Sequence, residues 1–343
     1  MIYIEENLNN IDYSELNALL AESLGREKAK DTSHTEKLFS NSQKYAFVYD
    51  DKKLVGAVRA LSDGEWSVIY NFTVSKEYEG KIEKELIKNI VEQLKGQHIF
   101  VNAESEKIGV FEEHGFQRTK TAFTYVGFDG IEEEYPKGYF LPLYYRFENE
   151  FENKKLPFPG HRKGNKTKKA EIVYSSARNT VDYKRVTEII FSAFDKINDD
   201  GGEISVEKIL KTRNVFDMSK YVFFAYDGNK LVGVARAITD EVEEAYIQNV
   251  AVDPEYQGYG IGWHLVTGIG DCIQKDGLNP FLHTHPGAVG FYNHKGFLRN
   301  KTTLDYRNEE ERHQSLTFES EQGFYMPKGF RFADELRLMC ENK

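Results

Sequence analysis

Residues 226–237 read YDGNKLVGVARA, and residues 49–60 read YDDKKLVGAVRA. This is one of five matches between the two halves of the chain, and all five occur in the same order, with an offset that drifts only from 177 to 185 residues. The other matched pairs are NFTVSKEYEG (71–80) with NVAVDPEYQG (249–258), GVFEEHGF (109–116) with GFYNHKGF (290–297), RTKTAFTY (118–125) with RNKTTLDY (299–306), and GYFLPLYYRF (138–147) with GFYMPKGFRF (323–332). A repeat near 180 residues is a duplicated domain, because solenoid units are only about 20–50 residues long.

We therefore predict two copies of one domain, residues 1–153 and residues 170–343, called the first and second copy below. Between them, residues 154–169 read KKLPFPGHRKGNKTKK, with seven basic residues and no acidic one. Two prolines and two glycines in so short a stretch favour an exposed linker, with nucleic-acid binding as the less favoured alternative.

Each copy shows the same succession of hydrophobic patterns, which predicts an α/β (α+β) fold with a mixed sheet. The predicted elements are a helix (16–24; 186–194), a hairpin (45–61; 221–238), a longer strand (69–74; 246–252), an amphipathic helix (82–94; 261–273), a short strand (99–101; 281–283), a short helix and a terminal strand. The aromatic segments 138–147 and 323–332 are predicted to be core or interdomain strands.

The composition is that of a soluble globular protein, with 343 residues, 40% of them apolar and a net charge of -10. Outside the linker, 38 basic and 55 acidic residues remain, so the two copies together carry -17, which argues against a general nucleic-acid binder. Cys272 and Cys340 cannot form a disulfide framework or a cysteine-based zinc site by themselves. We expect a cytoplasmic protein, because the sequence shows neither a secretory signal nor an apolar run of about 18 residues.

The stretch 250–262, VAVDPEYQGYGIG, lies between a predicted strand and a predicted helix. Its alternating glycines do not suit a helix interior, where each costs about 1 kcal/mol relative to alanine. They suit a turn whose N–H groups converge with those of the helix start, which predicts a cradle for a phosphate or pyrophosphate. A Rossmann loop fits less well, because DPEYQ separates the strand from the glycines, and no Gly-Lys-Ser/Thr of a P-loop follows.

This stretch resembles the acetyl-CoA-binding motif of the GNAT N-acetyltransferase superfamily, Q/R-x-x-G-x-G/A at the start of a helix after a strand. The resemblance is strong over about residues 170–310 and extends weakly, through the repeat, to about 1–130. It implies that the backbone of Val250, Ala251 and Val252 holds the pantetheine arm of acetyl-CoA. The implied pyrophosphate loop consists of Gln257, Gly258, Tyr259, Gly260, Ile261 and Gly262.

A second family signature, A-x-x-F-Y-x-x-x-G-F, matches residues 288–297. The resemblance implies that Tyr292 is the general acid that protonates the coenzyme-A thiolate, a role that suits a phenol with a pKa near 10. His285 stands three residues before Ala288, where the family frequently has an asparagine that contacts the cofactor. A buried core tyrosine is the structural alternative for Tyr292.

The general base is left open by the sequence. Family members often carry a glutamate on the cofactor-binding strand, but the corresponding positions here hold Tyr246 and Gln248. The candidates are Glu243, Glu244, His283, His285 and a water chain to solvent, and among the residues we select His283 and Glu244. We predict no metal site at the pair His283 and His285.

The first copy has lost most of these features. Of the three glycines only Gly80 remains, Glu77, Glu79 and Glu83 lie close to it, and Phe111 replaces the tyrosine. We therefore expect the first copy to keep the fold without the cofactor site.

The sequence thus predicts an acetyl-CoA-dependent N-acetyltransferase, with no metal, that acts on a primary amine of a small molecule through its second copy. A non-catalytic protein that binds coenzyme A or another ligand, or that regulates, is the alternative. Another acyl donor or an aminoacyl-tRNA donor is disfavoured by the acidic copies. The sequence specifies neither the acceptor nor the oligomeric state.

Overall fold

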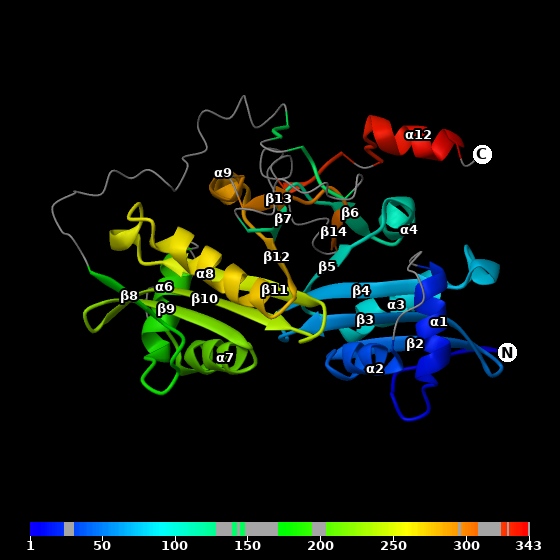
Figure 1. Ribbon diagram of the computed structural model, residues 1–343, viewed down its shortest axis with the longest axis horizontal. Coiled ribbons are helices and arrows are strands. Elements are labelled where there is room, and N and C mark those ends of the chain that lie inside the picture. Colours follow the sequence, from blue (N-terminus) through cyan, green and yellow to red (C-terminus); the bar gives the residue numbers. More distant parts are fainter. Residues whose placement is uncertain are drawn as a thin grey trace.

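The computed structural model describes residues 1–23, 31–127, 139–142, 145–147, 171–193, 204–293, 296–307, 324–327 and 329–341. The predicted linker, residues 154–169, lies outside these ranges. In Figure 1 the two copies lie side by side, with the first copy in blue and cyan and the second in green, yellow and orange.

The first copy contains the predicted elements together with an additional first strand and second helix. Asp31 caps that second helix, α2, by accepting a hydrogen bond from the Ser33 N–H at 3.0 Å. The elements are β1 (Ile2–Glu5), α1 (Tyr13–Ser23), α2 (Thr32–Ser40), β2 (Lys44–Asp50), β3 (Lys53–Ser62), β4 (Trp66–Val74), α3 (Glu83–Gln93), β5 (His98–Asn102), α4 (Ile108–Glu113), β6 (Phe116–Arg118) and β7 (Ala122–Tyr125).

The second copy repeats this order. Its elements are β8 (Ile172–Ser175), α6 (Tyr183–Ala193), α7 (Val206–Asp217), β9 (Tyr221–Asp227), β10 (Lys230–Thr239), β11 (Glu244–Val252), the 3-10 turn η6 (Pro254–Tyr256), α8 (Ile261–Lys275), β12 (Asn279–His283), the 3-10 turn η7 (Pro286–Ala288), α9 (Val289–Tyr292), β13 (Phe297–Arg299), β14 (Thr303–Tyr306) and α12 (Ala333–Glu341). The predicted hairpin of this copy is β9–β10, and Gly228 in its turn has φ +57°, a conformation that glycine adopts readily.

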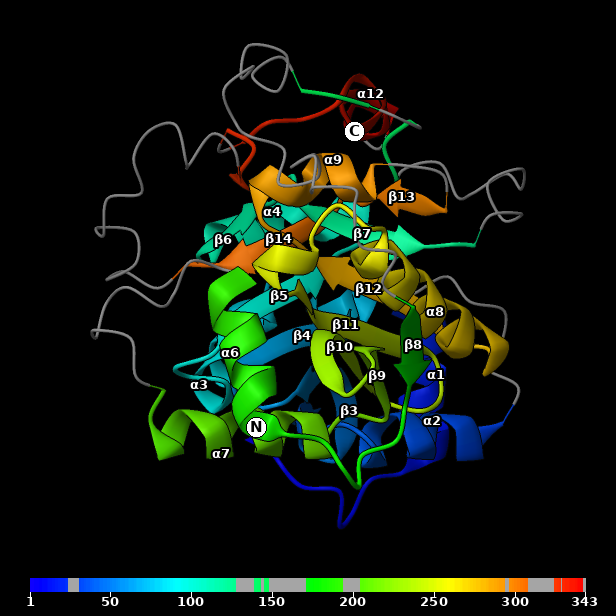
Figure 2. The same ribbon diagram turned by 90° about the vertical axis from the view of Figure 1, so that its left-hand side faces the viewer.

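These strands form two mixed seven-stranded sheets, which confirms the predicted fold class. In the second copy β11 is parallel to β12 and antiparallel to β10. Figure 2 shows α6 and α8 on opposite sides of β10 and β11. The apolar side of α8 packs on this sheet through Ile261, Leu265, Val266, Ile269 and Ile273, all of which are buried.

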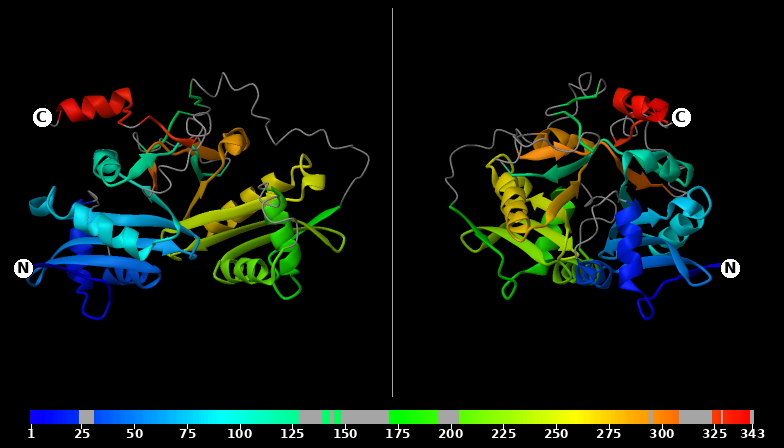
Figure 3. Two further views of the ribbon diagram at one scale, coloured as in Figure 1. Left: turned by 180° about the vertical axis from the view of Figure 1, so that it is seen from behind. Right: turned by 45° about the vertical axis from the view of Figure 1, so that its right-hand side comes forward.

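The two sheets exchange their last strands. The first sheet has the order β1-β2-β3-β4-β5-β14-β6, and the second has β13-β7-β12-β11-β10-β9-β8. Thus β14, from the second copy, lies between β5 and β6, while β7, from the first copy, lies between β12 and β13. The exchanged strands lie on the same side of the molecule as α12 (Figure 3). The predicted boundaries 1–153 and 170–343 describe the repeats in the sequence, but each sheet takes one strand from across them.

The prediction that segments 138–147 and 323–332 are strands is wrong for their described residues, which contain only isolated bridges, from Phe140 to Asn300 and from Tyr325 to Thr119. Their predicted position between the copies agrees with the packing of these residues. Leu141 and Phe147 from the first copy and Met326 from the second form one buried apolar cluster. A larger shared cluster joins Phe100 of the first copy to Tyr246 of the second, with Leu61, Val68, Tyr70, Ala122, Ile238 and Phe281.

Two buried ion pairs connect the copies reciprocally. Arg59 in the first copy contacts Asp240 in the second at 2.8 Å, and Arg236 in the second copy contacts Asp63 in the first. All four side chains are fully buried. Each arginine also donates through Nε to an asparagine of its own copy, Asn71 or Asn249, at 2.5 Å.

Removing the charge of Asp63 tests the importance of this interface. In Asp63→Asn, Arg236 would keep its buried position without a counter-charge, while the side-chain oxygen that holds the turn at Glu65 and Trp66 would remain. We expect the free energy of unfolding to fall by about 3 kcal/mol, measured by chemical denaturation. The matched control, Glu77→Gln, removes the exposed ion pair with Lys53 and should change it by less than about 1 kcal/mol. Equal effects of the two substitutions would contradict a central role for the buried pair.

Candidate functional site

The predicted anion loop forms an exposed turn that leads into helix α8. Gly258 and Gly260 have φ values of +86° and +79°, in the left-handed region that favours glycine. Gly260 is the N-cap residue of α8, which has 15 residues. The first N–H groups of a helix have no acceptor within the helix and carry the positive end of its dipole. The turn therefore offers an anion a set of backbone donors with favourable electrostatics.

Polar side chains fix this turn to the preceding strand. The Gln257 Nε2 group donates to the Val252 carbonyl at 3.2 Å, and the Glu255 N–H donates to the Asp253 carboxylate at 2.9 Å. Arg185, on α6, forms an ion pair with the same carboxylate. Gln257, predicted to belong to the pyrophosphate loop, thus also stabilises the turn, since its side chain forms a hydrogen bond with the end of β11.

The predicted pantetheine strand lies beside an opening in the sheet. Strands β11 and β12 pair only from Glu244 opposite Asn279 to Ile247 opposite Leu282, so they separate from Gln248 onward. Val250, Ala251 and Val252 lie beyond this point of separation, and the latter two pair with β10 on their other side. Among the described residues no strand pairs with this edge of β11, and its Val252 carbonyl accepts the hydrogen bond from Gln257.

A β-bulge marks the point where the strands separate. Asn249 has φ +49°, and the register between β10 and β11 shifts there. The side chain of Arg236 donates to the Asn249 side chain at 2.5 Å and also to the side-chain oxygen Oε1 of Gln248. The bulge is thus held by the same arginine that pairs with Asp63 of the first copy.

In the first copy, the loop that corresponds to the cradle binds a carboxylate of the same chain. There the Glu83 carboxylate accepts hydrogen bonds from the N–H groups of Gly80 and Ile82, at 2.7 and 3.2 Å. An anionic oxygen pair therefore already fills the loop of the first copy. In the repeat, Gly262 takes the place of Glu83, so the second copy has no carboxylate of its own at this position in the loop. The loop of the second copy therefore suits an external anion such as a pyrophosphate better than that of the first.

Tyr292 is at the end of α9 with its ring in the core. The residue is 6% exposed, and its ring contacts those of Phe291, Phe123 and Phe297, with centroids 4.8, 5.8 and 5.5 Å away. Burial raises the pKa of Tyr292, so the phenol stays protonated at neutral pH. Within the described residues its hydroxyl forms no hydrogen bond. The side chain is thus a protonated donor that is not engaged by those neighbours.

His283 is placed at the junction of the copies. Its Nε2 atom lies 2.7 Å from the Thr121 hydroxyl and 3.0 Å from the Thr119 hydroxyl, and its ring lies 4.2 Å from that of Phe100. Burial lowers the pKa of His283 to about 3, so the ring is neutral at pH 7. The corresponding residue of the first copy, Asn102, accepts a hydrogen bond at 2.6 Å from the hydroxyl of Thr303, the first residue of the exchanged strand β14. Because asparagine is no base, this shared contact favours a structural role at His283.

His285 is the N-cap residue of η7, where its Nδ1 atom accepts a hydrogen bond from the Gly287 N–H at 3.1 Å. Burial lowers its pKa, and its ring contacts Phe324 edge to face at 5.2 Å. His285 lies two residues after the end of β12. It is therefore near the end of the sheet at which β11 and β12 separate.

Glu244 lies at the other end of β11. Four residues separate it from Gln248, or about 13 Å along a strand. Burial, together with the nearby charge of Asp240, raises the pKa of Glu244 to about 8. Glu244 is therefore mostly protonated at neutral pH and lies away from the opening, so the structure does not bring this candidate base together with Tyr292.

Three residues at the opening were not among the selected site residues, namely Arg236, Gln248 and Asn249. Gln248 is 8% exposed, and its Nε2 atom has no hydrogen-bond partner among the described residues. The repeat could have indicated Arg236 and Asn249, because the first copy has the same residue types, Arg59 and Asn71, at the corresponding positions. A buried arginine that is repeated together with an asparagine indicates a shared structural contact.

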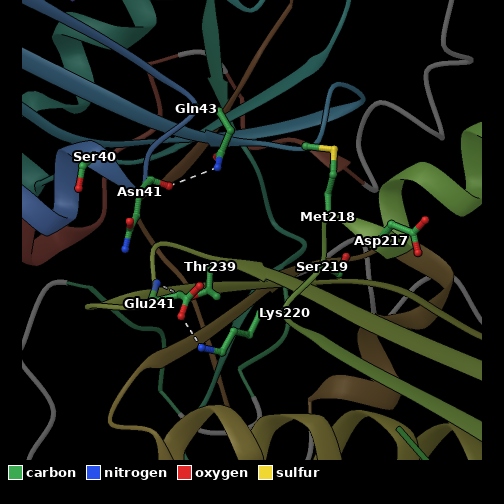
Figure 4. Close-up of a pocket in the computed structure, with 9 residues that line it drawn as sticks. All are labelled: Ser40, Asn41, Gln43, Asp217, Met218, Ser219, Lys220, Thr239 and Glu241. Atoms are coloured by element: carbon green, nitrogen blue, oxygen red, sulfur yellow. Dashed lines mark hydrogen bonds and ion pairs between the residues drawn. The ribbon is translucent and has the colours of Figure 1, made fainter. Parts of the chain in front are cut away.

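A polar pocket of about 400 Å³ lies between the copies, near the opposite end of β11 from the cradle. Figure 4 shows Asn41 and Gln43 of the first copy facing Lys220 and Glu241 of the second, with Lys220 and Glu241 forming an ion pair. Because β11 spans roughly 26 Å from Glu244 to Val252, this pocket is not part of the cradle.

Among the described residues, no group of three or more His, Cys, Asp or Glu side chains is placed to hold a metal ion. Nor does that part of the chain contain a helix long and apolar enough to cross a membrane.

Comparison with protein families matches both copies. Models described as "Acetyltransferase (GNAT) domain" match residues 10–132 and residues 219–299, which together make up more than half of the chain. This chain belongs to the GNAT acetyltransferase superfamily. The match to residues 10–132 also confirms that the first copy is a GNAT domain, as the repeat predicts.

Similar curated proteins match short parts of this GNAT chain. GCN5-related N-acetyltransferase 2, chloroplastic, of Arabidopsis thaliana is 44% identical over 69 residues, which are 20% of this chain and 27% of that protein. An uncharacterized N-acetyltransferase ycf52-like of Prochlorococcus marinus is 36% identical over 69 residues, 20% of this chain and 38% of that protein. The matches thus span well under half the length of these relatives.

Solved structures share the fold over most of the chain. A GCN5-related N-acetyltransferase from Sphaerobacter thermophilus is 13% identical, with a TM-score of 0.51, over 89% of this chain and 95% of that chain. The glucosamine N-acetyltransferase region of a fungal multi-domain β-N-acetylglucosaminidase is also 13% identical, with a TM-score of 0.52, over 90% of this chain and 38% of that chain. At this identity the likeness concerns the fold.

The raised pKa of Glu244 predicts how stability depends on pH. In the unfolded chain Glu244 ionises near 4.5, but in the folded protein it ionises near 8. Between these values only the unfolded state releases the proton, so folding loses stability as pH rises from about 4.5 to 8. We expect Glu244→Gln to raise the free energy of unfolding at pH 8 by on the order of 2 kcal/mol and to leave it unchanged at pH 4.

Denaturation at both pH values measures this effect. The control is Glu92→Gln, since the Glu92 side chain is 71% exposed and should show no such difference. A constant effect of Glu244→Gln from pH 4 to 8 would contradict the burial of an ionisable group there.

Proposed function

We propose that this GNAT protein transfers the acetyl group of acetyl-CoA to a primary amine, and that only the second copy does so. The observation that supports this most strongly is the contrast between the two cradles. The Glu83 carboxylate occupies the N–H groups of the first, whereas Gly262 leaves those of the second open. The same backbone design is therefore closed in one copy and available in the other.

In this proposal the backbone N–H groups from Gly258 to Gly262 bind the pyrophosphate, and the free edge of Val250–Val252 binds the pantetheine arm. Acetyl-CoA supplies the acetyl group as a thioester. The geometry of β11 supports this arrangement, because the strand runs from the opening in the sheet directly to the turn.

Tyr292 acts as the general acid. The amine nitrogen forms a bond with the acetyl carbon, the carbon–sulfur bond breaks, and the phenol of Tyr292 gives its proton to the leaving sulfur. Its protonation state is compatible with this role, because burial raises the pKa of Tyr292 and the proton is present at neutral pH. The amine loses its proton to solvent, since Glu244 is distant and His283 is engaged by two threonines.

A small cationic amine is the proposed class of acceptor. The support is the charge of -17 on the two copies, which favours the approach of a cation. The protein named as a histone acetyltransferase among the relatives matches this chain over only 69 residues, so its acceptor is no guide here.

A non-catalytic protein that binds coenzyme A is the second candidate. The observation in its favour is Gln248, which stands where family members often have a glutamate base and is held by Arg236. Release of free thiol from acetyl-CoA, measured across a panel of small primary amines, distinguishes the two candidates. Binding without release for any amine in the panel would favour this candidate.

Calorimetric titration with acetyl-CoA tests the cradle. We expect one molecule bound per chain and no measurable binding by Gly260→Val, because valine at φ +79° distorts the turn and places a side chain beside its N–H groups. The control, Gly80→Val, introduces the same strain at φ +73° in the first copy and should leave binding unchanged. If the intact protein does not bind acetyl-CoA, the proposed function is wrong.

The role of Tyr292 is tested by Tyr292→Phe. We expect turnover with an accepted amine to fall by about 10²–10⁴-fold, the usual contribution of a positioned acid, while the affinity for acetyl-CoA stays within about twofold. Steady-state kinetics and calorimetry separate the two quantities. Unchanged turnover would show that another group protonates the sulfur.

A further inference from the structure

The exchanged strand β7 brings Phe123 and Tyr125 of the first copy into the second copy, where they contact Tyr292 and helix α8. Leu282 pairs with Phe123, and Phe297 pairs with Tyr125, so β7 forms the link between β12 and β13. Without β7 these two strands have no partner between them. The core beneath the site is therefore built partly by the copy whose own cradle is closed.

Tyr125 is the residue of β7 that contacts helix α8. A Cβ atom added at Gly270 would lie 2.4 Å from the Tyr125 ring, so the helix approaches the ring as closely as only glycine allows. The Tyr125 hydroxyl donates to the Asp271 carboxylate at 2.5 Å, and the Gln274 side chain donates to the Tyr125 carbonyl at 3.3 Å. These three contacts fall within five consecutive residues of α8.

This attachment fixes the helix whose first turn forms the cradle. The α-helix is stiff over its 15 residues, so a shift at Gly270 moves its N-terminus at Ile261 as well. Two residues earlier on the same strand, and therefore on the same face of it, the ring of Phe123 contacts that of Tyr292. One strand of the first copy thus touches both the helix and the proposed acid.

The first copy lacks the equivalent attachment. There β14 provides Leu304 and Tyr306 at the positions of Phe123 and Tyr125, as the pairing with β5 and β6 shows. Helix α3 contains no glycine, and Tyr306 is only partly buried, with its ring on Phe116. Close packing of the tyrosine on a helical glycine therefore occurs in the copy with the open cradle.

We propose that Tyr125 is a positioning residue for acetyl-CoA, so that the first copy is a required part of the second copy's site. The inference rests on the proposed function, because it concerns the same cradle. It assigns a role to the first copy that depends neither on a ligand of its own nor on its lost glycines.

The test compares two tyrosines that occupy equivalent positions in the two sheets. In the full chain we expect Tyr125→Leu to weaken acetyl-CoA binding about tenfold, which corresponds to about 1.4 kcal/mol, whereas Tyr306→Leu should stay within about twofold of wild type. Calorimetry gives the dissociation constants, and thermal unfolding gives the stability of each variant. Tyr125→Phe, which removes only the bond to Asp271, is the milder variant and should weaken binding by about threefold.

A second substitution separates positioning from general loss of stability. Gly270→Ala forces the helix away from the Tyr125 ring and should weaken binding about tenfold in the wild-type background. In the Tyr125→Leu background the added methyl group meets a smaller side chain, so it should weaken binding by less than about twofold further.

The outcomes distinguish the two proposals. If wild type binds acetyl-CoA and the Tyr125 and Tyr306 variants bind it equally well, the positioning role is wrong while the proposed function stands. Additive effects of Gly270→Ala and Tyr125→Leu would also contradict it, because the two changes would then act independently. If wild type does not bind acetyl-CoA, the proposed function fails and this inference fails with it.

Discussion

The reciprocal ion pairs of Arg59 with Asp240 and of Arg236 with Asp63 hold the rest of the structure in place. A buried guanidinium without a counter-charge costs several kcal/mol, so each copy requires an aspartate from the other. Arg236 also bonds to Asn249 and Gln248, the two residues at which β11 leaves β12. The opening in the second sheet is thereby tied to the interface between the copies, and its position cannot change without disturbing a residue of the first copy.

The two copies show how a duplicated scaffold keeps its fold while one binding site closes. Each has the bulge, the buried arginine and the left-handed glycine after the strand. At the turn that follows, the copies differ, because in the first copy a glutamate side chain occupies the backbone N–H groups. Closing that turn leaves the sheet and the interface unaffected, because the bonds of Glu83 are to local backbone groups. Loss of binding and retention of structure are therefore independent in this chain.

Much of this fold could be predicted from the sequence, since the helices α3 and α8 and the hairpins carry strong periodic patterns. Helices α2 and α7 were missed because their apolar faces are narrow, and their main signals are the capping residues Asp31 and Ser205. The strand exchange could not be predicted at all. The alternation in RTKTAFTY is the same whichever sheet receives the strand, and nothing local in the sequence distinguishes the two.

The candidate site was predictable to the extent that it depends on backbone conformation. Glycines at 258 and 260 indicate left-handed residues, and the structure has them. The side chains of His283 and Glu244 were less predictable, because their environments include residues far away in the sequence, Thr121 for the first and Arg59 for the second. Titration and accessibility follow from such distant neighbours, which a local pattern does not contain.

The exchanged strands also determine the order in which the chain can complete its folding. Strand β5 is made early, but its partner β14 lies about 200 residues later, which takes about 10–40 seconds to synthesise at typical rates. During this interval β5 has an unpaired edge, and β7 has been made before the sheet that will receive it. The unfinished chain on the ribosome is consequently the form of this protein most exposed to aggregation and most dependent on protection by chaperones.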